Sequence, residues 1–255
     1  KSFKDQSTGK EYFKFETSSG IDPEEKISQK TSSVSDDEIE AEYFNQLAAL
    51  LELNQVEGHT DVFDDMCEWK SVNSFRLGYI FFCKKGSQFK SLPAKDYSIV
   101  FISPYITKCS HSFSDLELTI RIPLPKAEHV EQLKEIIAIK NLINSNFQTK
   151  LMEKKLEQRI NGFNKGTTTI TGIRYRLATL FKNESDISLN GKKEHLKNHL
   201  TRSYESVPEI LDELKISIFD KYFSDKYPLH PKYAIKLSKG NILKSLSDIA
   251  SDLTK

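Results

Sequence analysis

The 255-residue sequence has neither a phosphate-binding loop nor a zinc-binding motif. The pattern Gly-x-x-x-x-Gly-Lys-Ser/Thr, whose backbone amides and lysine hold nucleotide phosphates, does not occur. Cysteine and histidine residues also lack the spacing that tetrahedral zinc sites require. The sequence therefore gives no direct sign of an independent catalytic activity, and we expect neither a metal nor a cofactor.

Cysteine is scarce, and long apolar runs are missing. Cys67, Cys83 and Cys109 share no C-x-x-C spacing, and their odd number argues against a disulfide framework, so we expect free thiols in the cytoplasm. The longest apolar runs, such as Tyr79–Cys83 and Ser98–Ser103, are far shorter than the roughly 20 residues that cross a bilayer. There is also no secretory signal, so we expect no membrane contact. Since the chain does not begin with methionine, it is expected to be a fragment.

Charge is balanced overall but unevenly distributed. The formal net charge is +1 at pH 7. Residues 1–68 hold 6 Lys/Arg and 17 Asp/Glu, residues 69–182 hold 19 and 8, and the remainder hold 12 and 11. A basic middle segment is typical of a nucleic-acid face, but it is also typical of helices that are merely solvated. Both interpretations stay open from composition alone.

The first half of the chain predicts a mostly loop leader and then a sheet. Residues 1–34 contain one expected strand, Glu11–Glu16. Ser35-Asp36-Asp37-Glu38 matches a capping box, and the apolar spacing behind it predicts a helix to Leu53 that packs on the sheet. Expected strands are Asp61–Phe63, Cys67–Val72, Arg76–Cys83, Tyr97–Ser103 and Asp115–Ile122. Because its apolar residues do not alternate, Tyr97–Ser103 should be covered on both faces.

After Pro123 and Pro125 the composition becomes helical. Expected helices are Glu128–Ile160 as one long helix or a broken pair, Ile170–Phe181, Val207–Phe223 and a last helix that includes Ile242, Leu246, Ile249 and Leu253. The predicted fold class is therefore α+β, with a four- or five-stranded sheet and a packed helix in residues 35–125, followed by an all-helical domain in residues 126–255.

One group of residues has a pattern that could support catalysis. Asp61 followed by Glu68-Trp69-Lys70 is similar to the acidic pair and lysine of Mg²⁺-dependent restriction-type nucleases of the PD-(D/E)XK kind. A hairpin turning at Asp64-Asp65 would bring Asp61, Glu68 and Lys70 together, and Glu40 or Glu42 of the preceding helix would be a further ligand. Since Glu-x-Lys also arises by chance on exposed strands, a solvated strand face is the competing interpretation.

Several segments together resemble a known family. They are Trp69–Phe82, Leu92–Tyr97, Val100–Pro104, Arg121–Pro125 and Phe223–Tyr233. In this order they resemble a region of the large P-loop ATPases of bacterial phage-defence operons, the BREX and Pgl type, from about residue 38 onward. The resemblance implies a non-catalytic part of such an ATPase, in which Glu68 and Lys70 only flank a packed hairpin.

The expected function is thus a regulatory, scaffolding or DNA-contacting segment of a phage-defence ATPase. Its partners would be other defence subunits or the rest of its own larger chain, and DNA where phosphates are contacted. Candidate phosphate-binding residues are Lys150, Lys154, Lys155, Arg159, Lys165, Arg174 and Arg176. A Mg²⁺-dependent nuclease and a protein-interaction module without a nucleic-acid role are the alternatives.

Overall fold

A computed structural model describes residues 2–4, 11–13, 23–69, 74–145, 150–164, 172–189, 191–204 and 206–226. The chain divides into two compact units, each built from two separate segments. The first unit comprises Lys1–Ala48 and Leu124–Leu180, and the second comprises Ala49–Pro123 and Phe181–Lys255. The expected helix containing Ile242 falls outside the described residues.

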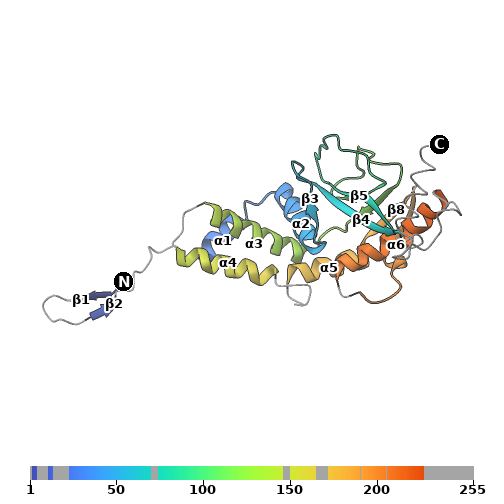
Figure 1. The fold of residues 1–255 in the computed structure, drawn as a ribbon. Helices are drawn as coiled ribbons and strands as arrows, with labels where there is room; N and C mark the ends of the chain where they lie inside the picture. Colours follow the sequence, from blue (N-terminus) through green and yellow to red (C-terminus); the bar gives the residue numbers. More distant parts are fainter. Residues whose placement is uncertain are drawn as a thin grey trace, which may run out of the picture. The chain divides into compact units, whose positions relative to one another are not determined.

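The first unit is mainly helical (Figure 1). Its helices are α1 (Pro23–Thr31), most of α2 (Asp36–Leu50), α3 (Ala127–Asn144), α4 (Lys150–Asn164) and the start of α5 (Ile173–Glu184). A two-stranded antiparallel pair, β1 (Ser2–Lys4) and β2 (Glu11–Phe13), precedes them. Helix α1 lies within the segment expected to be mostly loop. The expected helix over 128–160 is the broken pair α3 and α4.

Local chemistry explains where α2 begins. The Glu38 amide donates to Ser35 Oγ at 3.3 Å, and the Ser35 amide donates to Glu38 Oε2 at 2.9 Å. This reciprocal pair confirms the capping box predicted from the sequence. The bonds from the Ser35 amide and hydroxyl hold the pKa of Glu38 below its ordinary value. A core of Ile27, Ala138, Ile139, Leu142 and Leu156 joins α1, α3 and α4.

A seven-stranded sheet forms the centre of the second unit. In spatial order its strands are β3 (Asn54–Gln55), β4 (Val62–Trp69), β5 (Ser74–Cys83), β6 (Tyr97–Ile102), β7 (Glu117–Arg121), β8 (Asp186–Leu189) and β9 (Lys192–His195). Strands β5, β6 and β7 are parallel, and the outer pairs are antiparallel. The mixed α+β class is confirmed. However, seven strands exceed the four or five expected, and β8 and β9 lie in the segment expected to be all helical.

Helix α6 (Val207–Lys226) covers one face of this sheet, and the short 3₁₀ helix η2 (Leu196–His199) follows β9. Tyr97 on β6 packs its ring against Phe219 and Phe223 of α6, with ring centroids 4.7 and 6.3 Å away. On β5, Gly78 lies directly under that ring, and a Cβ there would be 2.3 Å from Tyr97 Cε2. Glycine is therefore required sterically at position 78.

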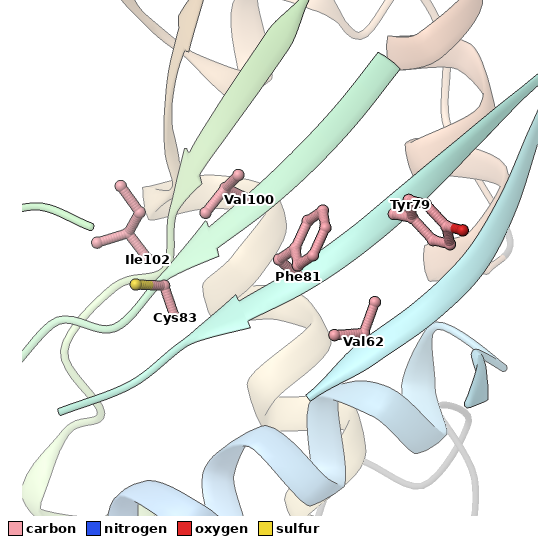
Figure 2. Close-up of a cluster of buried hydrophobic side chains, with 6 residues drawn as sticks. All are labelled: Val62, Tyr79, Phe81, Cys83, Val100 and Ile102. Atoms are coloured by element: carbon pink, nitrogen blue, oxygen red, sulfur yellow. The ribbon is translucent and has the colours of Figure 1, made fainter. Parts of the chain in front are cut away.

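Loops cover the opposite face of the sheet. Figure 2 shows the cluster on this face, formed by Val62, Tyr79, Phe81, Cys83, Val100 and Ile102. The two crossovers between parallel strands, residues 84–96 and 103–116, supply Phe89, Leu92, Ile106, Cys109 and Phe113 against it. All six residues of β6 are buried, which confirms the prediction of a strand covered on both faces.

Two sequence expectations about the sheet are wrong. The expected hairpin turning at Asp64-Asp65 does not exist, because β4 runs continuously from Val62 to Trp69. Cys83 and Cys109 form a disulfide, with Cα atoms 6.0 Å apart, and the third cysteine, Cys67, is buried outside this bond. The parallel register of β5 and β6 places the end of β5 beside the second crossover, a proximity that cysteine spacing does not reveal.

Candidate interaction site

The structure does not assemble the nuclease-like residues. Asp61 immediately precedes β4, which carries Glu68, so the seven residue steps from Asp61 to Glu68 correspond to about 23 Å. The Asp61 carboxylate instead pairs with Lys84 at 2.6 Å, and Glu68 is exposed. Lys70 lies outside the described residues. Glu40 and Glu42 are buried in the first unit, where Glu42 receives Lys140 Nζ at 2.7 Å.

The candidate phosphate-binding cations fall into two groups. Three of them are engaged within the first unit: Arg159 pairs with Glu24 and Glu135, Arg174 donates to Gln46 at 3.1 Å, and Arg176 pairs with Glu128 at 3.2 Å. Lys154 and Lys155 on α4 are exposed. Lys150 begins α4, but its side chain lies outside the described residues, as does all of Lys165. Of the seven candidates, the two that the structure describes as exposed are thus the adjacent lysines Lys154 and Lys155.

A buried polar network joins the helix-covered face of the sheet to α6. Lys215 of α6 donates to Asp65 Oδ1 at 2.9 Å and to the Met66 carbonyl at 3.0 Å, and it also pairs with Asp212 at 2.9 Å. The Tyr97 hydroxyl donates to the second oxygen of Asp65 at 2.7 Å. The Lys215 side chain is only 5% exposed, so its charge depends on these oxygens.

The electrostatics of the network keep both donors protonated. Burial by itself lowers the pKa of Lys215, but the Asp65 and Asp212 carboxylates more than offset it, and the pKa is raised. Burial also raises the pKa of Tyr97, and the negative charge of Asp65 raises it further. Both groups stay in their hydrogen-bond-donating form at neutral pH, so the arrangement positions charges rather than exchanging protons.

A cavity of about 460 Å³ adjoins this network. It lies between the start of β3, the middle of β4 and the first turns of α6, and Glu52, Asp64, Asp65 and Asp212 give its lining an acidic character against Lys215. Lys95 partly compensates this charge from the neighbouring crossover, since it binds Asp64 at 2.5 Å. The apolar part of the lining includes Met66 and Leu77, which extend onto the surface.

Met66, Leu77 and Phe75 form an exposed apolar strip on the loop-covered face. Their exposed fractions are 52%, 53% and 59%. Met66 pairs with Leu77, and Phe75 pairs with Glu68 on the next rung of that face, so the three side chains are neighbours on one β-hairpin. Contiguous exposed apolar residues of this kind mark contact surfaces, whereas isolated ones are ordinary.

Comparison with known proteins identifies the chain at the level of a family. Residues 25–227 match the family described as DUF6079 third domain. The chain belongs to this family. No curated protein and no solved structure matches it. The matched range begins near α1 and ends just after α6, so the DUF6079 third domain includes the strip, the network and the whole seven-stranded sheet.

The described part of this DUF6079 third domain holds no group of three or more His, Cys, Asp or Glu residues placed to bind a metal. None of the helices described is long and apolar enough to cross a membrane. Sequence patterns missed Lys215 because it is an ordinary lysine in an amphipathic helix, 150 residues from Asp65. The alternation of Phe75, Leu77 and Tyr79 along β5 was the available signal for the strip.

Proposed function

We propose that this chain is a non-catalytic scaffolding and regulatory segment of a larger phage-defence ATPase in the cytoplasm. The apolar strip would contact a neighbouring domain of that protein. The observation that carries the proposal is the contiguity of Met66, Leu77 and Phe75, each more than half exposed on adjacent rungs. An apolar surface of this kind lowers the solubility of a protein when nothing covers it. Its presence therefore favours an interpretation in which a partner covers the strip.

Two further observations support this choice of occupant. The family is described as a third domain, which favours neighbouring domains in the same polypeptide as the covering partner. The segments around the strip, Trp69–Phe82 and Leu92–Tyr97, are two of the five segments that resemble BREX and Pgl-type ATPases. A surface on and beside these segments would suit a contact that such proteins share.

The polar network also favours a structural role. Lys215 is held charged by two carboxylates and a carbonyl, so it is not available as a nucleophile or general base at neutral pH. Asp65 receives donors on both of its oxygens. The network therefore serves to fix α6 against β4 beside the strip.

The contact proposal is tested by substituting two exposed residues, one at a time, in the complete defence protein. Leu77→Asp puts a charge into the strip, and Leu124→Asp puts the same charge at a residue that is 61% exposed but lies in the other unit. We expect Leu77→Asp to abolish phage restriction in plaque assays and to increase hydrogen exchange in β4 and β5, with Leu124→Asp unchanged. Equal restriction by both variants would refute the strip as a contact surface.

A DNA-contacting role is the second candidate, because Lys154 and Lys155 are adjacent and exposed on α4. Duplex binding should then weaken with salt, and Lys154→Glu/Lys155→Glu should reduce the slope of log affinity against log salt by about 2. Lys193→Glu, at an exposed position on β9, is the control. Salt-independent binding would exclude this role.

The restriction-type nuclease gains no geometric support, since Asp61 is paired with Lys84 and distant from Glu68. Incubation of supercoiled DNA with Mg²⁺ tests it directly. Cleavage by the native chain that is lost in both Glu68→Ala and Lys70→Ala would overturn the non-catalytic proposal.

A further inference from the structure

A second cavity, of about 300 Å³, lies on the loop-covered face and shares no lining residue with the acidic cavity. It is formed by both crossovers, residues 89–95 and 111–114, over β5 and the start of β6. Tyr79 and Phe81, both visible in Figure 2, belong to its floor. A volume at the lower end of the range for small-molecule sites limits an occupant to about one nucleotide in size.

Aromatic rings line this cavity in a layered arrangement. Phe113 stacks on Phe81 with ring centroids 3.8 Å apart and planes at 18°, and Phe89 stands edge-on to both at 5.0 and 5.5 Å. His111 lies nearly parallel to Phe113, with ring centroids 6.0 Å apart. Phe89 and Phe113 are only partly buried and His111 is exposed, so aromatic surface remains accessible to a planar ligand.

The polar part of the lining is cationic and rich in hydroxyl groups. Lys90, Lys95 and His111 line it together with four serines, and none of the described lining residues is acidic. Lys95 is already bound to Asp64 and to the Gly78 carbonyl. Lys90 and His111 are exposed, as are the hydroxyl-bearing residues Ser91 and Ser112. An anion would therefore meet lysine, imidazole and hydroxyl donors at the mouth of the cavity.

We infer that this cavity binds a nucleotide unit, with its base against the rings of Phe89, His111 and Phe113 and its phosphate at Lys90. Aromatic rings beside cations and hydroxyls are the combination that recognises nucleobases joined to phosphates, and base stacking on such rings tolerates different bases. The same chemistry is offered by a free mononucleotide and by a residue of single-stranded nucleic acid. The inference does not depend on the apolar strip.

The two sources are separated by titrating the complete chain with AMP and, in parallel, with a single-stranded oligothymidylate, using calorimetry at two salt concentrations. If the affinity for AMP is comparable to the affinity for each oligonucleotide site, then the ligand is a free mononucleotide. Oligonucleotide binding at least tenfold tighter, and weakened by salt, identifies a strand. The absence of binding by both probes at millimolar concentration would overturn the inference.

Variants at exposed positions test the site without disturbing the fold. His111→Ala and Lys90→Glu should each weaken binding of the better probe about tenfold or more. Lys108→Glu is the matched control, because Lys108 is an exposed lysine on the same crossover as His111 but lines a different cavity. Native affinity in both site variants would refute the assignment, as would equal losses in all three. Leu77 does not line this cavity. The binding measurements therefore test the nucleotide proposal even if Leu77→Asp shows that the strip is not a contact surface.

Discussion

The two faces of the central sheet differ in what covers them. On the helix-covered face, Phe101 packs against Phe181 of α5, and Tyr97 packs against the fully buried Phe219 of α6. On the other face, crossovers without helices leave Phe89 and Phe113 only partly buried, two cavities open and the strip uncovered. Parallel strands usually carry helical crossovers. Here the crossovers are loops. The helix-covered face is therefore closely packed, whereas the loop-covered face leaves surface available for contacts.

The largest test of this contrast compares two phenylalanines. Phe219→Ala removes a fully buried ring and should lower the free energy of unfolding by about 3–5 kcal/mol. Phe89→Ala, on the loop-covered face, should cost about 1–2 kcal/mol because the ring is partly solvated already. Urea denaturation measures both. Similar losses would show that the loops pack as firmly as α6.

Lys215→Met tests the buried charges under α6. The substitution keeps much of the side-chain volume but leaves Asp65 without its cation, so we expect a loss of about 3 kcal/mol in unfolding free energy. The Lys154→Met variant on the exposed surface of α4 should change it by less than about 0.5 kcal/mol. If Lys215→Met is equally harmless, then the network does not hold α6 in place.

Reduction of the Cys83–Cys109 disulfide tests how the loop-covered face is held. The bond closes a loop with a sequence separation of 26 residues, so its loss should destabilise the protein by about 2–3 kcal/mol through the greater freedom of the unfolded chain. The measurement is urea denaturation with and without dithiothreitol. Cys109→Ser should be insensitive to the reductant. Unchanged native stability in dithiothreitol would contradict the expected contribution.

High pH should weaken the helix-covered face specifically. Lys215 and Tyr97 have raised pKa values in the folded protein, against ordinary values of 10.5 and 10.0. Their stabilising contribution is complete below these ordinary values and is lost as the pH rises, by up to about 1.4 kcal/mol per pH unit for each group. Stability should therefore fall from about pH 10. Tyr97→Phe should decline less steeply in urea denaturation at pH 8–11, and parallel declines would exclude Tyr97 as a cause.

Patterns confined to a few neighbouring residues were predicted well. The capping box at Ser35, the apolar run of Tyr97–Ser103 and the spacing in Val207–Phe223 each correspond to an observed feature. Each is a pattern of residues within one turn, one strand or one helix, and the order of residues in the sequence is sufficient to indicate such a pattern. The predicted strand break at Asp64-Asp65 failed because turn-forming residue types did not outweigh pairing with the whole length of β5.

Sites formed across long separations were not predictable in this way. The Lys215–Asp65 contact and the Cys83–Cys109 bond involve residues whose local sequence is unremarkable. The proposed nucleotide cavity was also missed, because Phe89 and His111 belong to different crossovers that approach each other only in the folded sheet. The sequence also could not show which basic residues have acidic partners. Arg159, a candidate phosphate-binding residue, pairs with Glu24 and Glu135.

The sequence by itself determined α2, the buried strand β6 and α6, because apolar periodicity and end-capping act over a few residues, but it did not reveal α1, β8 or β9. Only the tertiary structure decided that β8 and β9 complete the sheet begun by β3–β7, and which cations and thiols find partners. The physical reason is that a strand's hydrogen-bonding partner and a buried charge's counterion are chosen by the path of the whole chain. Local pattern specifies that such a partner is needed, and topology specifies which residue it is.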